Sequence, residues 1–181
     1  MSDPLDQPIV RERRPDDLPV LCDLLAAQQA ESSYPVRWPL PFPVHDFLVR
    51  PGELKAWVVE VDGEVAGHVT AASVDEALAP VFEGATGAHG HHMVSVLFTG
   101  AAARGRGLGG LLLDTAVAWI RERGHVPVLD VVPVHAPALA LYRSRGWVEV
   151  GSWRFPWLAP ELPDVALMAL PPYPSRSSTP R

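Results

Sequence analysis

The segment from His91 to Ile120 limits the folds that are open to this chain. The apolar run HHMVSVLFT (91–99) predicts a strand, and LLLDTAVAWI (111–120) predicts an apolar helix. Between them, GAAARGRGLGG (100–110) is too rich in glycine for a regular element. A strand that leads through such a turn into a helix is typical of an α/β fold. The turn offers backbone N–H groups and the positive end of a helix dipole to a phosphorylated ligand.

The remaining sequence alternates short apolar runs with amphipathic ones. Five prolines in residues 31–53 exclude a long helix there, although residues 44–49 are expected to form a turn or two. The Asp62-Gly63 pair predicts a tight hairpin turn. We expect strands over 9–13, 55–61, 64–72, 91–99, 126–134, 147–155 and 164–170. We expect helices over 15–29 (with Asp16 or Asp17 as N-cap), from the glycine turn to Gly124, and over 136–145, and a partly helical connector over 74–90.

Composition narrows the class of protein. The net charge of −6 argues against a general nucleic-acid binder, which needs a basic face, so an anionic ligand would be met locally by Arg104 and Arg106. The first residues lack the apolar core of a signal peptide, and no apolar run is long enough to span a bilayer. A single cysteine, Cys22, forms no intrachain disulfide. We therefore expect a cytoplasmic protein with no nucleic-acid or membrane partner, folded as one domain over 1–172 with a Pro/Ser-rich tail over 173–181.

The glycine turn fits two motifs. Gly105, Gly107 and Gly110 match the G-x-G-x-x-G of dinucleotide sites, and Asp130 follows at about the distance of the acidic ribose ligand. However, residues 100–104 separate the strand from the first glycine, and too little chain follows Asp130 for a doubly wound sheet. The second motif, R-x-x-G-x-G, is a pattern of pyrophosphate-binding loops and is formed by Arg104, Gly107 and Gly109. Because the dinucleotide motif fails on these two points, we favour R-x-x-G-x-G.

Two separate stretches of the chain, 97–110 and 129–147, together resemble motifs of the GNAT superfamily of acyl-CoA-dependent N-acetyltransferases. The stretch LFTGAAARGRGLGG (97–110) is similar to the family's strand, pyrophosphate loop and helix start. The stretch LDVVPVHAPALALYRSRGW (129–147) is similar to its second motif, with Trp147 where the family usually has Phe and His135 where it usually has Asn. The resemblance implies an α/β GNAT fold, with a mixed, mostly antiparallel sheet of about seven strands flanked by helices.

The resemblance also implies where acetyl-CoA, the acyl donor, would bind. The strand at Leu97 to Thr99 would splay from its neighbour and pair through its main chain with the pantetheine amides. The glycine turn would hold the pyrophosphate, because glycine lets several N–H groups face one anion. The expected acetyl-CoA-binding residues are Leu97, Phe98, Thr99, Arg104, Gly105, Arg106, Gly107, Leu108, Gly109, Gly110, His135, Ala138 and Tyr142.

Acetyl transfer needs a neutral amine, a polarised carbonyl and a proton for the departing thiolate. Tyr142 matches the family tyrosine that is usually assigned as general acid, although a tyrosine packed on the sheet is the alternative. Met93 stands where many relatives carry a basic glutamate, and it cannot take a proton. We expect Asp130 to act as the base, followed by His91 through a water. An aspartate paired at the edge of the core is an equally weighted alternative to a catalytic Asp130.

The acceptor would lie under the loop between the first two helices. Tyr34 and Trp38 are candidate substrate-binding residues there, together with Ser95, which strand alternation places on the same side as Met93. A lid that packs on the core without touching substrate is as consistent with the loop. We expect a small-molecule primary amine as the acceptor; the alternatives are a peptide N-terminus, a longer acyl donor, or a non-catalytic acyl-CoA-binding domain.

The sequence favours neither a zinc site nor a covalent acyl-cysteine. The cluster HGHH (89–92) lacks a second ligand pair for zinc, so we expect no metal and a solvated histidine turn. Cys22 falls on the apolar stripe of the first helix, which favours a structural thiol and direct transfer in a ternary complex. The sequence leaves the oligomeric state open, with a homodimer among the possibilities.

Overall fold

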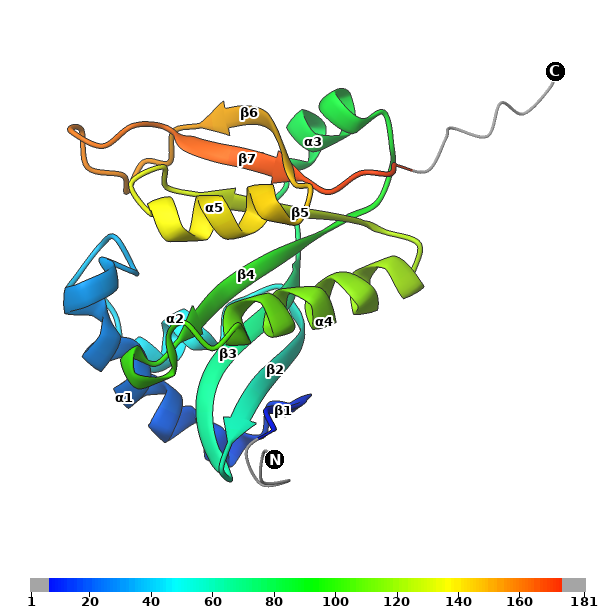
Figure 1. Ribbon diagram of the computed structural model, residues 1–181. Coiled ribbons are helices and arrows are strands. Elements are labelled where there is room, and N and C mark those ends of the chain that lie inside the picture. Colours follow the sequence, from blue (N-terminus) through cyan, green and yellow to red (C-terminus); the bar gives the residue numbers. More distant parts are fainter. Residues whose placement is uncertain (1–6, 174–181) are drawn as a thin grey trace, which may run out of the picture. The chain divides into compact units, whose positions relative to one another are not determined.

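The computed structural model describes residues 7–173 and has a seven-stranded sheet in the order β1-β2-β3-β4-β5-β7-β6, flanked by helices (Figure 1). The predicted α/β architecture is confirmed. Neighbouring strands pair antiparallel except β4 and β5, among the pairs whose register is defined. The chain divides into two compact units, Met1–Ala72 with Val94–Ala118, and Ser73–Met93 with Trp119–Arg181, and each is described by itself.

The first unit is built on the β2–β3 hairpin. Asp62 and Gly63 both have positive φ, 53° and 78°, as a two-residue turn between twisted strands requires. The predicted hairpin is therefore confirmed. The elements that lie wholly or partly in this unit are β1 (Ile9–Glu12), α1 (Leu18–Ser32), α2 (Val44–Leu48), β2 (Glu53–Val61), β3 (Glu64–Ser73), β4 (His91–Thr99) and α4 (Leu108–Glu122), with short 3₁₀ turns at Pro15–Asp17 and Ala101–Ala103.

The predicted N-cap position of α1 is confirmed, although the helix begins at Leu18 rather than at Pro15. Asp17 occupies the N-cap position, but its carboxylate makes no capping hydrogen bond to the helix. It accepts instead from both terminal nitrogens of Arg11 at 2.8 Å and from the backbone N–H of Arg14 at 2.6 Å. These contacts lower the pKa of Asp17, chiefly through the hydrogen bonds from Arg11. The carboxylate therefore ties β1 to the turn before α1.

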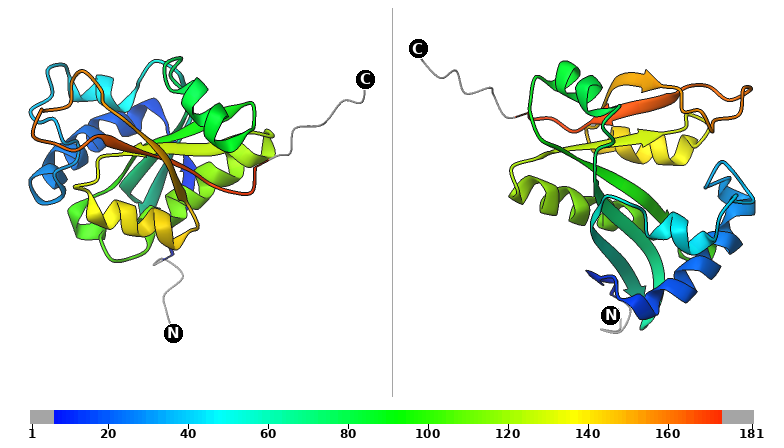
Figure 2. Two further views of the ribbon diagram at one scale, coloured as in Figure 1. Left: turned by 90° about the horizontal axis from the view of Figure 1, so that it is seen from above. Right: turned by 180° about the vertical axis from the view of Figure 1, so that it is seen from behind.

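The core of this unit lies on the α1 face of its strands. Leu21 and Leu25 of α1 pack with Val58 of β2 and with Val96 and Phe98 of β4, and all five are buried. The helix α4 covers the opposite face, where Leu112 lies beside Gly67 of β3. Figure 2 shows α1 and α4 from two further directions. The end of β4 is therefore enclosed between two helices.

The second unit contains the parallel pairing of β4 with β5. Its defined register runs from His91↔Val126 to Met93↔Val128, and β5 pairs antiparallel with β7, which pairs with β6. Strand β5 ends at Val131, three residues earlier than predicted. The elements are α3 (Ala79–Thr86), β5 (Val126–Val131), α5 (Ala136–Ser144), β6 (Val148–Trp153) and β7 (Val165–Ala169), with a core of Leu78, Phe82, Ala88, Val126, Val128, Leu167 and Ala169.

The predicted connector over 74–90 contains the helix α3, so its partly helical character is confirmed. Residues 174–181 of the predicted tail lie outside the described residues. Among residues 7–173, no helix is long and apolar enough to cross a membrane.

Candidate active site

The glycine loop after β4 adopts the geometry of an anion-binding turn. Gly105 and Gly107 have φ of 75° and 74°, a backbone conformation that glycine adopts without strain. The N–H of Leu111 donates to the carbonyl oxygen of Gly107 at 3.1 Å, which closes the first turn of α4. The N–H groups of Leu108, Gly109 and Gly110 are thus first-turn groups that lack an intrahelical acceptor.

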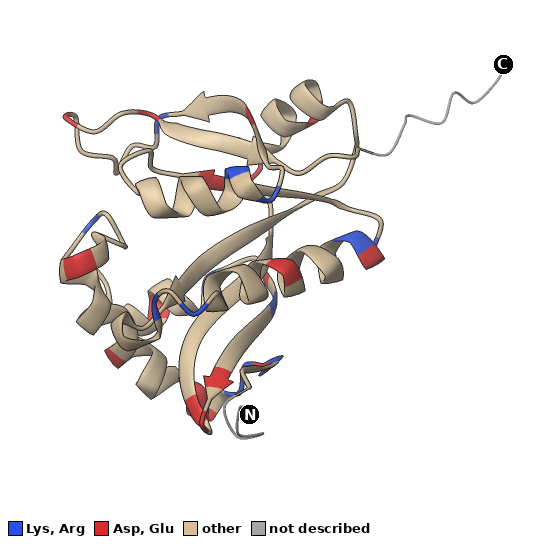
Figure 3. Ribbon diagram, viewed as in Figure 1, with Lys and Arg blue, Asp and Glu red and all other residues tan. Residues whose placement is uncertain are grey.

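This geometry corrects one part of the sequence interpretation. The sequence predicted one irregular turn over residues 100–110, but Gly109 and Gly110 lie within α4, and Gly105 and Gly107 shape the loop. Both Gly105 and Gly107 have open space where a Cβ would stand, so their positive φ rather than crowding explains glycine there. Figure 3 shows the basic segment of this loop in blue just before α4.

Arg104 is already engaged within the protein. Its Nη1 lies 2.9 Å from Oε2 of Glu31, and its Nη2 donates to the backbone oxygen of Gln28 at 3.4 Å. Both acceptors belong to the last turns of α1. The guanidinium of Arg104 therefore connects the glycine loop to the end of α1.

Gln28 also fixes the segment that follows α1. The residue is 2% exposed, and its Nε2 donates to the backbone oxygen of Tyr34 at 2.5 Å, while its Oε1 accepts from Ser32. The Tyr34 ring packs edge to face on Phe47, with 5.9 Å between ring centroids. The ring of this predicted substrate residue thus contacts the core. Trp38 and Ser95, the other predicted substrate residues, are both partly exposed.

The end of β4 is distorted at Val96. This residue has φ of 49°, which is rare and strained for a β-branched side chain. Phe98 is buried in the core beside α1, whereas Leu97 and Thr99 are partly exposed. Gly67 permits close contact with this segment, since a Cβ there would lie 2.9 Å from the backbone oxygen of Phe98.

A buried polar chain, not predicted from the sequence, reaches Val96 from β3. His68 is fully buried; its Nδ1 lies 2.9 Å from the carbonyl oxygen of Val96, and its Nε2 lies 3.1 Å from Nη1 of Arg13. Arg13 donates in turn to Glu53 at 2.6 Å. Burial lowers the pKa of His68 to about 4. A histidine at the centre of the apolar run EVAGHVTAA was the available signal.

In the second unit, α5 carries three of the predicted residues. Tyr142 is 8% exposed and lies 6.0 Å from the ring of Trp147, centroid to centroid. Ala138 stands one helical turn before it on the same face. His135 occupies the N-cap position of α5, but its side chain makes no capping hydrogen bond.

The two candidate bases lie apart on neighbouring strands. His91 pairs with Val126, and Asp130 lies four residues farther along β5, roughly 13 Å at strand spacing. Nε2 of His91 lies 2.8 Å from Oγ1 of Thr86, and burial lowers the pKa of His91. Asp130 is partly exposed. The structure therefore does not bring the two together as one acid–base pair.

The three histidines of the HGHH stretch contact different groups. His89 is exposed and lies 3.5 Å from Glu83, His91 contacts Thr86, and the His92 ring stacks on His125 with 3.8 Å between centroids. Cys22, on α1, is partly buried, and burial raises the pKa of its thiol.

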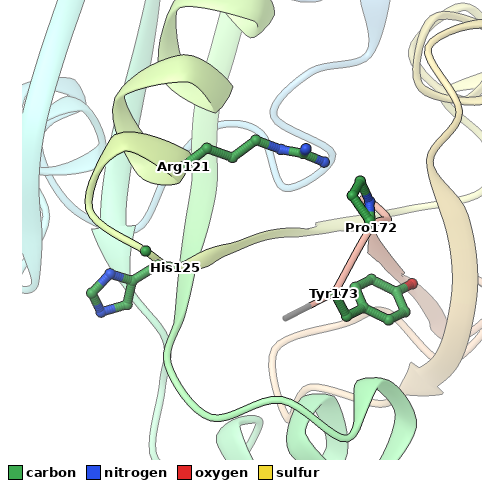
Figure 4. Close-up of a pocket in the computed structure, with 5 residues that line it drawn as sticks. Arg121, His125, Pro172 and Tyr173 are labelled. Carbon is green, nitrogen blue, oxygen red and sulfur yellow. The ribbon is translucent and has the colours of Figure 1, made fainter. Parts of the chain in front are cut away.

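A shallow cavity of about 290 Å³ lies at the end of α4 (Figure 4). Its lining contains none of the predicted site residues. Arg121 crosses one side and donates to the backbone oxygens of Leu170 and Pro171 at 3.3 and 2.7 Å. Burial raises the pKa of Tyr173 on the other side.

Several known proteins resemble this chain. Ribosomal-protein-alanine N-acetyltransferase from Brucella melitensis is 25% identical, with a TM-score of 0.66 over 89% of this chain and 98% of that chain. Ribosomal-protein-S18-alanine N-acetyltransferase from Escherichia coli is 18% identical, with a TM-score of 0.67 over 95% and 98%. Arabidopsis thaliana NAA60, solved in complex with acetyl-CoA, is 20% identical, with a TM-score of 0.66 over 90% and 98%. None of the curated proteins matches the sequence.

The model of the acetyltransferase (GNAT) family matches residues 21–147, which include the glycine loop and the second motif that ends at Trp147. The chain thus belongs to the acetyltransferase (GNAT) family.

Proposed function

We propose that this enzyme transfers the acetyl group of acetyl-CoA directly to a primary amine, in a complex that holds both substrates. The observation that carries the proposal is the loop before α4, where Gly105 and Gly107 have positive φ and the next three N–H groups lack intrahelical acceptors. Such a turn suits a pyrophosphate, because the N–H groups and the helix dipole both favour an anion. The acetyl thioester supplies the activated acyl carbon.

The residues proposed to hold the pyrophosphate are those of the loop and the first turn of α4. Arg104 and Arg106 supply positive charge, and Gly105, Gly107, Leu108, Gly109 and Gly110 supply backbone N–H groups. The main chain of Leu97, Phe98 and Thr99 is proposed to pair with the pantetheine amides, as an added strand would. From the second motif, His135, Ala138 and Tyr142 complete the proposed acetyl-CoA contacts.

In the proposed reaction, the amine nitrogen forms a bond to the acetyl carbon and the carbon–sulfur bond breaks. Tyr142 donates a proton to the departing sulfur, a role open to a phenol that stays protonated at neutral pH, and regains a proton when the nitrogen loses its second proton as the amide forms. Asp130 accepts the proton of the incoming ammonium, directly or through water. The contact of His91 with Thr86 supports a structural role for that imidazole, so His91 ranks second as base.

Direct transfer is favoured over an acyl-enzyme on Cys22. The nucleophile of an acyl-cysteine route would be the thiolate, and burial raises the pKa of this thiol. The thiol therefore stays protonated at neutral pH and reacts slowly.

The acceptor proposed first is a small-molecule amine, met by Tyr34, Trp38 and Ser95. A second candidate is the N-terminal amine of a protein. The observation that favours this candidate is the similarity, at 25% identity, to an enzyme named for acetylating alanine on a ribosomal protein.

The test is release of free CoA thiol from acetyl-CoA in the presence of an amine panel. The panel contains aliphatic mono- and diamines, aminoglycoside-type amines, free amino acids, and short peptides with a free or blocked N-terminus. Turnover with small amines supports the first acceptor class, and turnover with free but not blocked peptides supports the second. A folded protein that binds acetyl-CoA and yields no thiol with any amine would reject the proposal in favour of a binding domain.

A further inference from the structure

The contacts of His68 define its protonation state. Arg13 can only donate hydrogen bonds, so the Nε2 atom of His68, 3.1 Å from Nη1 of Arg13, must accept. A neutral imidazole with Nε2 as acceptor carries its proton on Nδ1. The N–H at Nδ1 therefore donates to the carbonyl oxygen of Val96, 2.9 Å away.

The chain continues from His68 to a carboxylate on β2. Nη2 of Arg13 donates to Oε1 of Glu53 at 2.6 Å, while Nη1 also reaches the backbone oxygen of Leu48 at 3.3 Å. The side chains of Arg13 and Glu53 are only 9% and 20% exposed. Oε2 of Glu53 is buried and has no hydrogen-bond partner among residues 7–173.

Stability alone does not account for this arrangement. Burying an ion pair costs several kcal/mol of desolvation per charge, and replacing such pairs by apolar side chains is often neutral or stabilising. An incompletely satisfied carboxylate adds to the cost. A role in orienting His68 would explain why a charged pair lies behind the ring.

The group that receives the hydrogen bond is a strained one. Val96 has φ of 49°, in the left-handed region, which is unfavourable for a β-branched residue. Two contacts hold it: its side chain packs into the core with Leu21 and Leu25, and its carbonyl accepts from His68. Without the second contact, the peptide that follows Val96 would be free to rotate toward an ordinary strand conformation.

That peptide carries the N–H of Leu97. In a trans peptide, the C=O of one residue and the N–H of the next point in opposite directions. Because His68 fixes the direction of the Val96 carbonyl, it also fixes the direction of the Leu97 N–H, away from His68. A donor held in place before the reaction stabilises charge that develops on a carbonyl oxygen better than one that must reorient.

We propose that His68, supported by Arg13 and Glu53, is a positioning residue for acetyl transfer: it holds the Val96–Leu97 peptide so that the Leu97 N–H faces the acetyl carbonyl. The proposal rests on the proposed function, since it assigns the end of β4 to acetyl-CoA. It predicts that loss of the hydrogen bond lowers kcat more than it weakens acetyl-CoA binding, because the donor matters most where negative charge develops.

The decisive pair of variants is His68→Leu and His68→Asn. The two side chains are nearly isosteric and both lose the contact with Arg13, but only the asparagine amide can still donate to Val96. We expect His68→Leu to lower kcat at least tenfold, with the acetyl-CoA Kd from calorimetry within about threefold of wild type. His68→Asn should recover kcat to within about threefold.

Thr70→Val is the matched control. Thr70 lies on the same face of β3, is 3% exposed, and its hydroxyl has no hydrogen-bond partner among the described residues. Removing this second buried polar group should leave kcat unchanged. An equal loss in Thr70→Val would mean that kcat follows general damage to β3 and would overturn the proposal.

Other outcomes are equally clear. Unchanged kcat in folded His68→Leu, equal losses in the leucine and asparagine variants, or a rise in Kd alone would each overturn the positioning role. Absence of turnover in wild type would instead reject the proposed function. Should His68→Leu not fold, imidazole ¹⁵N NMR of wild type still tests the assignment: a neutral ring protonated on Nδ1 is expected, and protonation on Nε2 would contradict it.

Discussion

The guanidinium of Arg104 and the carboxylate of Glu31 lie 2.9 Å apart and join the glycine loop to the end of α1. Both side chains are substantially exposed, 38% and 63%, so the pair contributes little to stability. The pair matters for ligand binding. If Arg104 contacts the phosphates of acetyl-CoA, the carboxylate of Glu31 competes with those phosphates for the guanidinium.

The first prediction follows from this competition. Glu31→Gln removes the rival charge, so acetyl-CoA should bind more tightly, by up to about fivefold at low salt. Calorimetric titration measures the change. Glu76→Gln, which alters the net charge equally at another exposed position, should leave the affinity unchanged. Equal tightening in both variants would assign the effect to long-range charge rather than to Arg104.

The second prediction concerns the first turn of α4. Gly109→Asp should abolish acetyl-CoA binding, because it adds bulk and negative charge where the pyrophosphate is proposed to lie. The backbone of Gly109 is helical, so the substitution creates no left-handed strain, unlike one at Gly107. Gly84→Asp, an exposed helical glycine of α3 with open space around it, is the matched control. Normal affinity in a folded Gly109→Asp protein would rule out the loop as the binding site.

The elements that could be predicted from the sequence are those with a strong local signal. Alternating apolar residues followed by Gly100 defined β4 from His91 to Thr99, and the Asp62-Gly63 pair defined the hairpin. The end of β5 was predicted three residues too late, because the apolar run VPVLDVVPV continues past Val131, where the strand ends. Val132 is buried although it follows the strand.

The buried polar chain could not be predicted, for a different physical reason. Arg13, Glu53, His68 and Val96 come from separate segments, and only the pairing of the strands brings them within hydrogen-bond distance. Likewise, nothing in the local sequence distinguishes Gly105 and Gly107, which shape the loop, from Gly109, which lies in the helix. Contacts between residues far apart in the sequence decide both the members of the polar chain and the conformation of these glycines.

The third prediction tests Tyr142 as the proton donor. Tyr142→Phe keeps the ring and removes only the hydroxyl, so kcat should fall by ~10²–10⁴-fold while the acetyl-CoA Kd changes little. Tyr173→Phe removes a partly buried hydroxyl elsewhere and should leave kcat unchanged. Turnover within about threefold of wild type would make Tyr142 a packing residue.

The fourth prediction separates the two candidate bases by their pH–rate profiles. Asp130→Asn should lower kcat/KM chiefly near neutral pH and recover as the pH rises and the free amine accumulates. His91→Ala should leave the shape of the profile unchanged if His91 only supports α3 through Thr86. Burial lowers the pKa of His91, so an acidic limb of the pH–rate profile that His91 controlled would lie below pH 6.5. Loss of that limb in His91→Ala, with a wild-type profile in Asp130→Asn, would exchange the two roles.

The last prediction concerns stability in acid and follows from the burial of His68. Its pKa is about 4 in the folded protein and about 6.5 when the chain is unfolded, so the unfolded state binds the extra proton first as the pH falls. The contribution of neutral His68 to stability is therefore complete above pH 6.5 and is lost as the pH falls toward 4. The loss amounts to about 3 kcal/mol.

Urea unfolding at pH 7.5 and pH 4 measures this loss. Carboxylates also change the stability of wild type in this range, so the comparison is with His68→Asn, which lacks the titrating ring and keeps the other groups. The free energy of unfolding should fall by about 3 kcal/mol more in wild type than in the variant. Burial also lowers the pKa values of His91 and His92, whose contributions have the same sign and cancel in the comparison. Parallel losses in the two proteins would show that His68 titrates near its ordinary pKa and is not held neutral between Arg13 and Val96.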